Sequence, residues 1–281
     1  MKKNDLVTLR IDDMGIDGEG IGKADGLTLF IKDAVVGDLV TAKIMKLKKT
    51  YGYARLMEII EPSKDRVEPP CPYSRACGGC QIMEMSYPAQ LDFKQRKVRN
   101  NLKRIGGFSE EFLDGVMEPI VGMTEGDSST EKTDGNKDGD LCPLRYRNKA
   151  QYPFGTDKEG KVVTGFYAGR THSIISNDDC LLGSEVNKTV LREVMDYMKE
   201  NNVVSYDEEK RTGILRHVLI RTTHDNGDIM VCLVVNAKQI PNQDSLIERL
   251  TKIEGMRSIS ININTENTNV ILGKTTKVLW G

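Results

Sequence analysis

Three cysteines stand within ten residues of one another in this chain of 281 residues, and their spacing restricts the fold more than any other feature. Cys71, Cys77 and Cys80 follow a C-x5-C-x2-C pattern, with Gly78 and Gly79 between the last two. Thiolates at this spacing can close on one soft metal centre, because sulfur ligands favour zinc and iron–sulfur clusters over hard cations. The segment is therefore predicted to form a metal-binding loop that takes a fourth ligand from elsewhere in the chain.

The other cysteines are candidates for that fourth ligand, and their sequence contexts differ. Cys180 follows the polar turn 177–179, where a loop can direct a thiolate towards a metal. Cys232 lies in the apolar run 230–234, which is more typical of a small buried hydrophobic residue. Cys142 borders a polar, charged segment, which is a poor position for a rigid ligand.

Zinc and a four-iron cluster both accept four cysteines, so the spacing leaves the two open. The adjacent glycines Gly78 and Gly79 favour the cluster, because residues without a side chain let backbone N–H groups approach and hydrogen-bond the sulfurs. A catalytic thiol is a weaker interpretation, since a lone nucleophile does not need neighbours at metal-ligand spacing.

Residues 1–60 have the pattern of a small all-β barrel and are predicted to be one domain. Short alternating apolar runs recur at regular spacing, and a glycine-rich turn region separates the first two. The predicted strands are Leu6–Ile11, Leu27–Ile31, Leu39–Met45 and Tyr51–Ile60.

Basic and aromatic residues alternate around the last turn of this domain, where Tyr51, Tyr53 and Arg55 follow a lysine-rich stretch. Cations that neutralise phosphates and exposed rings that stack on bases are the combination that binds single-stranded RNA. A lysine-rich hairpin tip also serves solubility alone, so this stretch leaves both interpretations open. The lysines are Lys43, Lys46, Lys48 and Lys49.

A proline-containing linker, 61–70, leads into the cysteine motif, and a helix is predicted after it. Ser86 and Pro88 suit a helix start and Gly106–Gly107 an end, which places the helix from Pro88 to about Ile105. Its predicted buried stripe is Leu91, Val98, Leu102 and Ile105.

The rest of the chain is predicted to be an α+β domain that spans 61–281 and contains one insertion. Residues 123–140 carry six acids and two lysines without apolar periodicity, which predicts disorder. Mixed helix and strand patterns follow, with a hairpin over 214–235 and a late strand at 269–272. No glycine-rich strand–turn–helix and no parallel βαβ unit are expected.

The chain begins with a polar segment, and its longest apolar run, 229–235, is far shorter than the ~20 residues that a membrane helix needs. Six cysteines in such a chain argue against a disulfide framework. We therefore expect a cytoplasmic protein that is monomeric and does not associate with membranes.

Several runs together resemble one family, the RNA uracil-5-methyltransferases of the RumA/TrmA group. The β-rich N-terminus resembles the TRAM module of that family, and the later runs resemble its iron–sulfur central domain. The likeness covers nearly the whole chain apart from 123–140. The residues that carry it are Cys71, Cys77 to Gln81, Gln90, Leu91, Lys94, Tyr146 to Gln151, Gly165 to Tyr167 and Leu215 to His217.

The resemblance implies a four-iron, four-sulfur cluster held by Cys71, Cys77, Cys80 and Cys180. It also implies methylation of uridine C5 in RNA, in 23S ribosomal RNA for the more similar type and in transfer RNA for the other. In that chemistry a thiolate adds to C6, S-adenosylmethionine supplies the methyl group, and a base removes the C5 proton after the nucleotide has left its stack. RNA is expected to bind, with weak sequence preference, through Lys48, Lys49, Arg145, Arg147, Lys149 and Arg216.

The chain departs from the family where it ends, at Gly281, because the family continues into a doubly wound methyltransferase domain. We therefore expect a fragment without that domain, its nucleophilic cysteine or its S-adenosylmethionine site, and we assign no catalytic residue. Such a chain would bind RNA and a cluster but transfer no methyl group. The alternatives are a stand-alone iron–sulfur RNA-binding module and a zinc-ribbon-like interaction protein.

Overall fold

The computed structural model describes residues 1–123 and 143–281, which form two compact units. One unit contains residues 1–75 and 80–143, and the other contains residues 76–79 and 144–281. Each unit has a hydrophobic core of its own. The predicted disordered insertion lies outside the described residues except for Met123. The predicted division at residue 60 into a TRAM module and an iron–sulfur domain stays a prediction.

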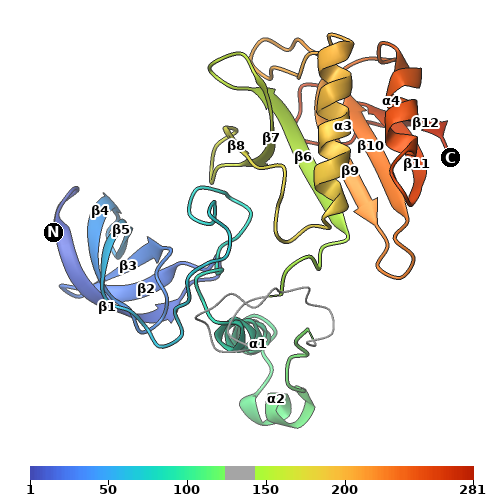
Figure 1. Ribbon diagram of the computed structural model, residues 1–281. Helices are drawn as coiled ribbons and strands as arrows, with labels where there is room; N and C mark the ends of the chain where they lie inside the picture. Colours follow the sequence, from blue (N-terminus) through green and yellow to red (C-terminus); the bar gives the residue numbers. More distant parts are fainter. Residues whose placement is uncertain (124–142) are drawn as a thin grey trace. The chain divides into compact units, whose positions relative to one another are not determined.

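The first unit begins with a closed five-stranded barrel, which confirms the predicted β-barrel (Figure 1). The order around the barrel is β1-β2-β3-β5-β4, and every neighbouring pair is antiparallel except β3 and β5. Alternate residues such as Leu29, Ile31 and Ile44 point inward and are fully buried, because successive strand side chains face opposite sides. The strands are β1 (Leu6–Met14), β2 (Gly20–Ala24), β3 (Leu27–Lys32), β4 (Leu39–Leu47) and β5 (Tyr51–Glu61).

The glycine-rich stretch predicted as a turn region contributes strand β2. Gly20 and Gly22 belong to this strand and are buried. A Cβ atom on Gly22 would lie 2.3 Å from the carbonyl oxygen of Arg10 on β1, which is closer than side chains can come. Glycine therefore serves here to bring two strands together, a use that looks like a turn signal in the sequence.

Two helices complete this unit, α1 (Tyr87–Arg104) and α2 (Glu110–Val116). Helix α1 matches the predicted helix to within one residue at each end, but α2 is not predicted by the sequence pattern. The predicted buried stripe is wrong, since Val98 is 52% exposed. The buried side chain of α1 is instead Gln90, whose amide donates to the carbonyl of Met85 (3.0 Å). No helix among residues 1–123 and 143–281 combines the length and apolar character needed to cross a bilayer.

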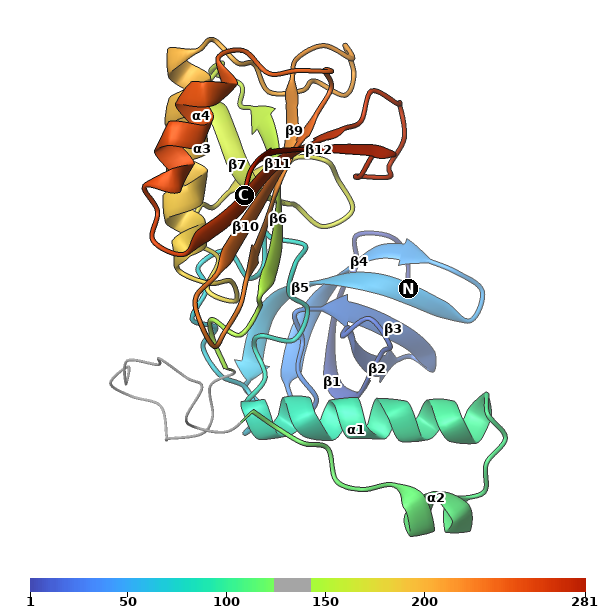
Figure 2. The ribbon, with the colours of Figure 1, turned by 90° about the vertical axis from the view of Figure 1, so that its right-hand side faces the viewer.

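The second unit is a seven-stranded mixed sheet in the order β12-β11-β10-β9-β6-β7-β8. Helices α3 and α4 lie side by side on one face of this sheet, as Figures 1 and 2 show. The elements are β6 (Lys149–Thr156), β7 (Val162–Tyr167), β8 (Ile174–Ser176), α3 (Val186–Glu200), β9 (Leu215–Thr222), β10 (Ile229–Val235), α4 (Gln243–Thr251), β11 (Met256–Ile263) and β12 (Thr275–Trp280).

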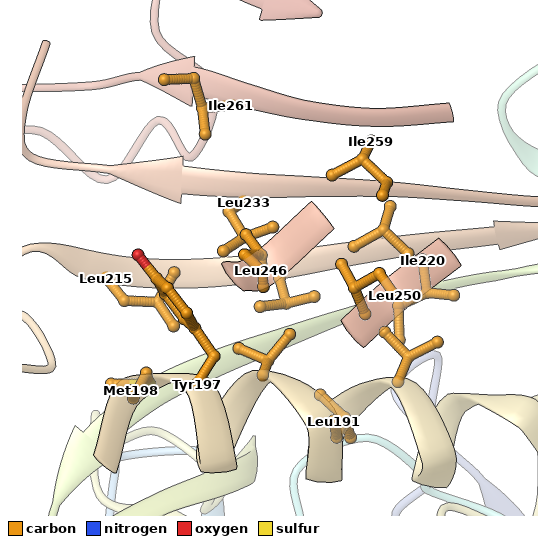
Figure 3. Packing of buried hydrophobic residues seen from close by; sticks show 14 of the residues in the cluster. Leu191, Tyr197, Met198, Leu215, Ile220, Leu233, Leu246, Leu250, Ile259 and Ile261 are labelled. Atoms are coloured by element: carbon orange, nitrogen blue, oxygen red, sulfur yellow. The ribbon is translucent and has the colours of Figure 1, made fainter. Parts of the chain in front are cut away.

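The core of the second unit lies between the sheet and these two helices (Figure 3). Leu191 and Tyr197 of α3 and Leu246 of α4 are buried against strand residues such as Leu233 and Ile259. Each such side chain contributes about 1.5–3 kcal/mol on burial, so the helix-covered face holds this unit together. Both helices of the second unit among the described residues lie on this one face of the sheet.

The fold-class expectation is wrong for this part of the chain. Strand β10 pairs with β9 in the predicted antiparallel hairpin, but on its other side it pairs in parallel with β11. The segment β10–α4–β11 is therefore a parallel βαβ unit, which the expected α+β pattern excluded. The strand expected at 269–272 does not form, because carbonyl groups of that run accept hydrogen bonds from the side chain of Asn264.

Candidate nucleic-acid interface

Three aromatic rings cluster on the outer surface of the barrel. Phe30 on β3 pairs in register with Tyr53 on β5, and their ring centroids lie 5.7 Å apart. Tyr51 stands edge-on to both, at 5.9 Å from Phe30 and 5.7 Å from Tyr53. The rings point outward because Leu29 and Ala54, which alternate with them along the strands, belong to the core. All three rings are half-buried and so keep a face or edge at the surface.

A row of cations crosses the same face beside the rings. Lys32 is paired with Arg55 across β3 and β5, and Arg55 is paired with Lys43 across β5 and β4. Like charges directly opposite each other destabilise a sheet unless an anion separates them. Lys32 lies 3.8 Å from Asp33, whereas Arg55 and Lys43 have no ion pair within the described part of the chain. Lys32 also donates to the carbonyl of Arg75 (3.1 Å), so Arg55 and Lys43 are the members of the row whose positive charge the described residues do not neutralise.

The predicted contacts Lys48 and Lys49 lie at the exposed turn between β4 and β5. The backbone N–H of Lys48 closes this turn onto the carbonyl of Tyr51 (2.8 Å), which fixes the tip next to the rings. The sequence pattern indicates Tyr51 and the lysines but not Phe30, because the parallel pairing of β3 with β5 leaves no trace in the local sequence. Period-2 alternation of Phe30 with buried neighbours is the signal that could have found it.

Two of the predicted contacts in the second unit are exposed where the chain enters β6. Arg147 and Lys149 both have exposed side chains, and Tyr146 beside them is 43% exposed. The backbone N–H of Arg147 donates to the carbonyl of Leu182 (2.8 Å), so this exposed segment has an anchored main chain. Basic and aromatic side chains are again combined at the surface.

Arg216, by contrast, is only 6% exposed. Its Nη1 atom donates to the carbonyl oxygens of Asn264 (3.0 Å) and Glu266 (2.9 Å), and its guanidinium carbon lies 4.5 Å from the centre of the Tyr206 ring. These contacts tie the loop after β11 to the start of β9. The guanidinium group is therefore already used inside the protein.

The neighbouring His217 is also buried, at 6% exposure. Burial, with a smaller contribution from the charge of Arg216, lowers the pKa of His217 to about 4. Its Nδ1 atom is buried and has no hydrogen-bond partner among the described residues. The imidazole is consequently neutral near pH 7 and is part of the packed sheet.

Arg145 holds the loop that carries Cys180. Its Nη1 atom donates to the carboxylate of Asp179 (2.8 Å) and to the carbonyl oxygens of Cys180 (3.1 Å) and Gly183 (3.2 Å). Partial burial acts to raise the pKa of Asp179, but the hydrogen bonds from Arg145 and Lys188 more than offset it, so that pKa is lowered. A half-buried thiol thus sits in a loop fixed by an ion pair and main-chain contacts.

The glycine pair of the cysteine motif has two different uses. The N–H of Gly78 donates to the carbonyl of Tyr167 (2.9 Å), and Cys77 forms an isolated bridge with Ala168. The N–H of Gly79 donates to the sulfur of Cys77 (3.4 Å). This second contact is the N–H to sulfur arrangement that an anionic cluster favours. The segment 76–79 is thereby attached to the end of β7.

Among residues 1–123 and 143–281, no three His, Cys, Asp or Glu side chains are grouped as metal ligands. Cys71 and Cys80 fall in the first unit, and Cys77 and Cys180 fall in the second. Cys142, the rejected alternative, lies outside the described residues. The four-cysteine cluster therefore stays a prediction, based on the spacing and on the Gly79 contact.

In a βαβ unit, a cofactor such as S-adenosylmethionine binds where the chain leaves the first strand, which here is the end of β10. The connection from β10 to α4, residues 236–242, contains no glycine. Glycine-rich turns at this place let the backbone approach a cofactor closely. This connection therefore does not fit the cofactor, and no described residue is assigned a step of methyl transfer.

Comparison with known proteins adds the class of protein to this geometry. Residues 2–57 match the TRAM domain family, and this range contains the barrel except for the end of β5. The whole chain is similar to proteins named "uncharacterized RNA methyltransferase". It is 43% identical over 282 residues to one from Halalkalibacterium halodurans, 41% identical to one from Clostridium tetani and 40% identical to one from Clostridium acetobutylicum. These matches cover 100% of this chain but only 56–57% of the length of each relative.

A solved structure shares the fold. The Pyrococcus abyssi tRNA (uracil-54, C5)-methyltransferase, crystallised with S-adenosyl-L-homocysteine, matches 96% of this chain and 55% of its own with a TM-score of 0.60 and 18% identity. These matches overturn the expectation that a methyltransferase domain is missing. The chain spans about half the length of proteins named methyltransferases, so its end at Gly281 says nothing about the domain content of the protein.

Proposed function

We propose that the protein methylates C5 of a uridine in RNA with S-adenosylmethionine as methyl donor, and that this chain supplies contacts to the RNA. The relatives named RNA methyltransferases and the fold shared with a tRNA (uracil-54, C5)-methyltransferase support the reaction class. The observation that carries the RNA role is the cation row Lys32, Arg55 and Lys43 beside outward rings on the TRAM barrel.

The proposed phosphate contacts are the exposed cations Lys48, Lys49, Arg147 and Lys149. Arg145 and Arg216 complete the set, but their guanidinium groups bind carbonyl oxygens of the protein. Their contribution to RNA binding would therefore be indirect, through the loops that they hold in place.

We propose ribosomal RNA of the 23S type as the substrate, and the tRNA named for the structural neighbour is the competing choice. The test incubates the full-length protein with methyl-labelled S-adenosylmethionine and either unmodified 23S ribosomal RNA or unmodified tRNA. Label at uridine C5 in ribosomal RNA supports the proposal, and label in tRNA alone would replace the substrate. RNA binding without label in either would favour the non-enzymatic RNA-binding module.

We propose in addition that Cys71, Cys77, Cys80 and Cys180 bind one four-iron, four-sulfur cluster. The C-x5-C-x2-C spacing and the Gly79 N–H bond to the sulfur of Cys77 support this assignment. Iron and acid-labile sulfide, measured in protein purified without oxygen, would separate a cluster from zinc. Zinc without sulfide would contradict the cluster.

A further inference from the structure

The outer face of the barrel carries a pair of rings and a pair of cations at successive positions along β3 and β5. Across β3 and β5, the pair Phe30 and Tyr53 forms one level of the face, and the pair Lys32 and Arg55 forms the next level along the strands. Residues two apart on a strand share a face, so all four side chains point outward. A level of rings therefore lies next to a level of cations.

We infer that this face binds single-stranded RNA by stacking unpaired bases on Phe30 and Tyr53 while the cation row binds the adjoining phosphates. The inference rests on the proposed RNA function and adds the kind of RNA that the barrel selects. Each base has an aromatic face that can stack on a ring, but in a duplex those faces are covered by neighbouring base pairs. Only an unpaired strand can use both levels at once.

The ring geometry fits stacking better than burial within the barrel. The planes of Phe30 and Tyr53 are tilted by 35°, whereas Tyr51 is nearly perpendicular to both, at 88° and 85°. Phe30 and Tyr53 thus present adjoining surfaces, with Tyr51 as a side wall. The apolar core under them is complete without these rings, because Leu29, Ile31 and Ala54 already fill it.

The charges on this face favour a polyanion over an apolar partner. Lys46 is opposite Tyr53 on β4, so cations flank the rings from a third strand. Repulsion between the paired cations Lys32, Arg55 and Lys43 is relieved when a phosphate lies across the row. Lys23 on β2, paired with Thr28 next to the rings, adds an exposed cation on the other side.

A second pair of exposed rings in the same unit provides the contrast. Phe108 and Phe112 at α2 are stacked at 5.3 Å and 17°, and both are exposed. Glu110 and Glu111 lie in the first turn of this helix, and Glu110 forms ion pairs with Arg99 and Lys103 of α1. The cations Arg99 and Lys103 beside this pair are thus already bound to a carboxylate, so a variant there is a matched control for loss of an exposed ring.

The experiment measures binding of the chain to a fluorescein-labelled RNA of about 12 nucleotides, which is within the site size of small barrels. The same sequence is presented as a single strand and as a duplex. We expect single-stranded RNA to bind more tightly, and Tyr53→Leu to weaken that binding about tenfold. Tyr53→Phe, which keeps the ring, and Phe112→Leu should both bind as the unchanged chain does.

The duplex separates stacking from simple charge attraction. Arg55→Gln should weaken single-stranded and duplex RNA alike, since its contact is to phosphate, while Tyr53→Leu should weaken the single strand alone. Circular dichroism of each variant shows whether the barrel is folded, and if Tyr53→Leu unfolds, Phe30→Leu is the replacement. Equal binding of duplex and single strand, or full binding by a folded Tyr53→Leu variant, overturns the inference. Failure of the full-length protein to methylate any RNA would contradict the proposed reaction and leave the stacking result standing.

Discussion

Two cations of the barrel and two arginines of the mixed sheet are used in opposite ways. On the barrel, Lys43 and Arg55 face outward without an ion pair among the described residues. In the second unit, Arg216 is buried on two carbonyl oxygens, and Arg249 is shared between Glu193 and Glu200. Lys43 and Arg55 are therefore available to a ligand, whereas Arg216 and Arg249 bind groups of the protein itself.

This difference shows what decides whether a basic residue is available to RNA. A planar guanidinium with several donors can satisfy backbone carbonyls at loop crossings, so arginines near strand ends serve the scaffold. On the outer face of the barrel, Lys32 donates to the carbonyl of Arg75 (3.1 Å), whereas Lys43 and Arg55 donate to no carbonyl among the described residues. The partners of each basic side chain, and not the number of basic residues, therefore indicate which cations are available to RNA.

The largest expected effect is the loss of the proposed iron–sulfur cluster. Cys180→Ala should lose the iron of protein purified without oxygen, because a four-cysteine cluster cannot replace a missing thiolate easily. Iron and sulfide assays and the visible absorbance would measure it. Cys142→Ala is the matched control and should retain full iron. The reverse pattern would mean that Cys142, not Cys180, is the fourth ligand.

Arg216→Ala tests the scaffold role directly. The change removes two hydrogen bonds from a charged donor and the contact with Tyr206, so the free energy of unfolding should fall by about 3 kcal/mol or more. Urea denaturation would measure it. Arg55→Ala should change stability by less than about 0.5 kcal/mol and weaken RNA binding. If Arg216→Ala kept its stability but lost RNA affinity, the contrast between the two regions would fail.

Stability in acid should depend on His217. The folded-state pKa is depressed to about 4, so the unfolded chain binds the proton first as the pH falls. The stabilising contribution is complete above the unfolded pKa of about 6.5 and is lost as the pH falls towards about 4, roughly 3 kcal/mol in all. Denaturation at several pH values should show a flatter profile for His217→Gln. An equally steep profile for a folded His217→Gln variant would contradict this contribution.

The smallest expected effect is on the salt dependence of RNA binding. Replacing Arg147 and Lys149 together with Ala should flatten the slope of log affinity against log salt by roughly 0.7 per lost contact on a single strand. Lys158→Ala, at an exposed turn of the same sheet, should change it little. An unchanged slope in the double variant would remove the entry to β6 from the interface and leave the barrel as the RNA-binding region.

The sequence predicts those features that depend on local periodicity. Alternating apolar residues are enough to indicate β1, β3, β4 and β5, and the cap and proline signals locate α1. Strand β2 is missed because Gly22 serves a close strand contact, and the βαβ unit is missed because β10 satisfies the pattern of a hairpin with β9 while also pairing with β11. Both errors concern pairing between strands, which single-sequence patterns do not contain.

The same limit of local sequence patterns applies to the candidate site. Lys48 and Tyr51 lie three positions apart in the chain and are visible as a motif, whereas Phe30 joins them only through the β3–β5 pairing. In the sequence, Arg216 looks like a phosphate ligand. Its carbonyl partners lie in the loop after β11, far away in the chain, so the local sequence does not show that the side chain is already bound. The chemical type of a residue is readable from the sequence, but its partners are not.

The parallel pairing of β3 with β5 also has a consequence for how the protein matures. Phe30 lies on β3 and Tyr53 on β5, and β4 separates these strands in the sequence. Neither hairpin of the barrel therefore carries the complete ring surface by itself. On the stacking inference, the complete ring surface exists only after β5 has paired with β3, so a chain that ends before β5 does not offer it. RNA bound to that surface would add to the stability of the closed barrel by mass action.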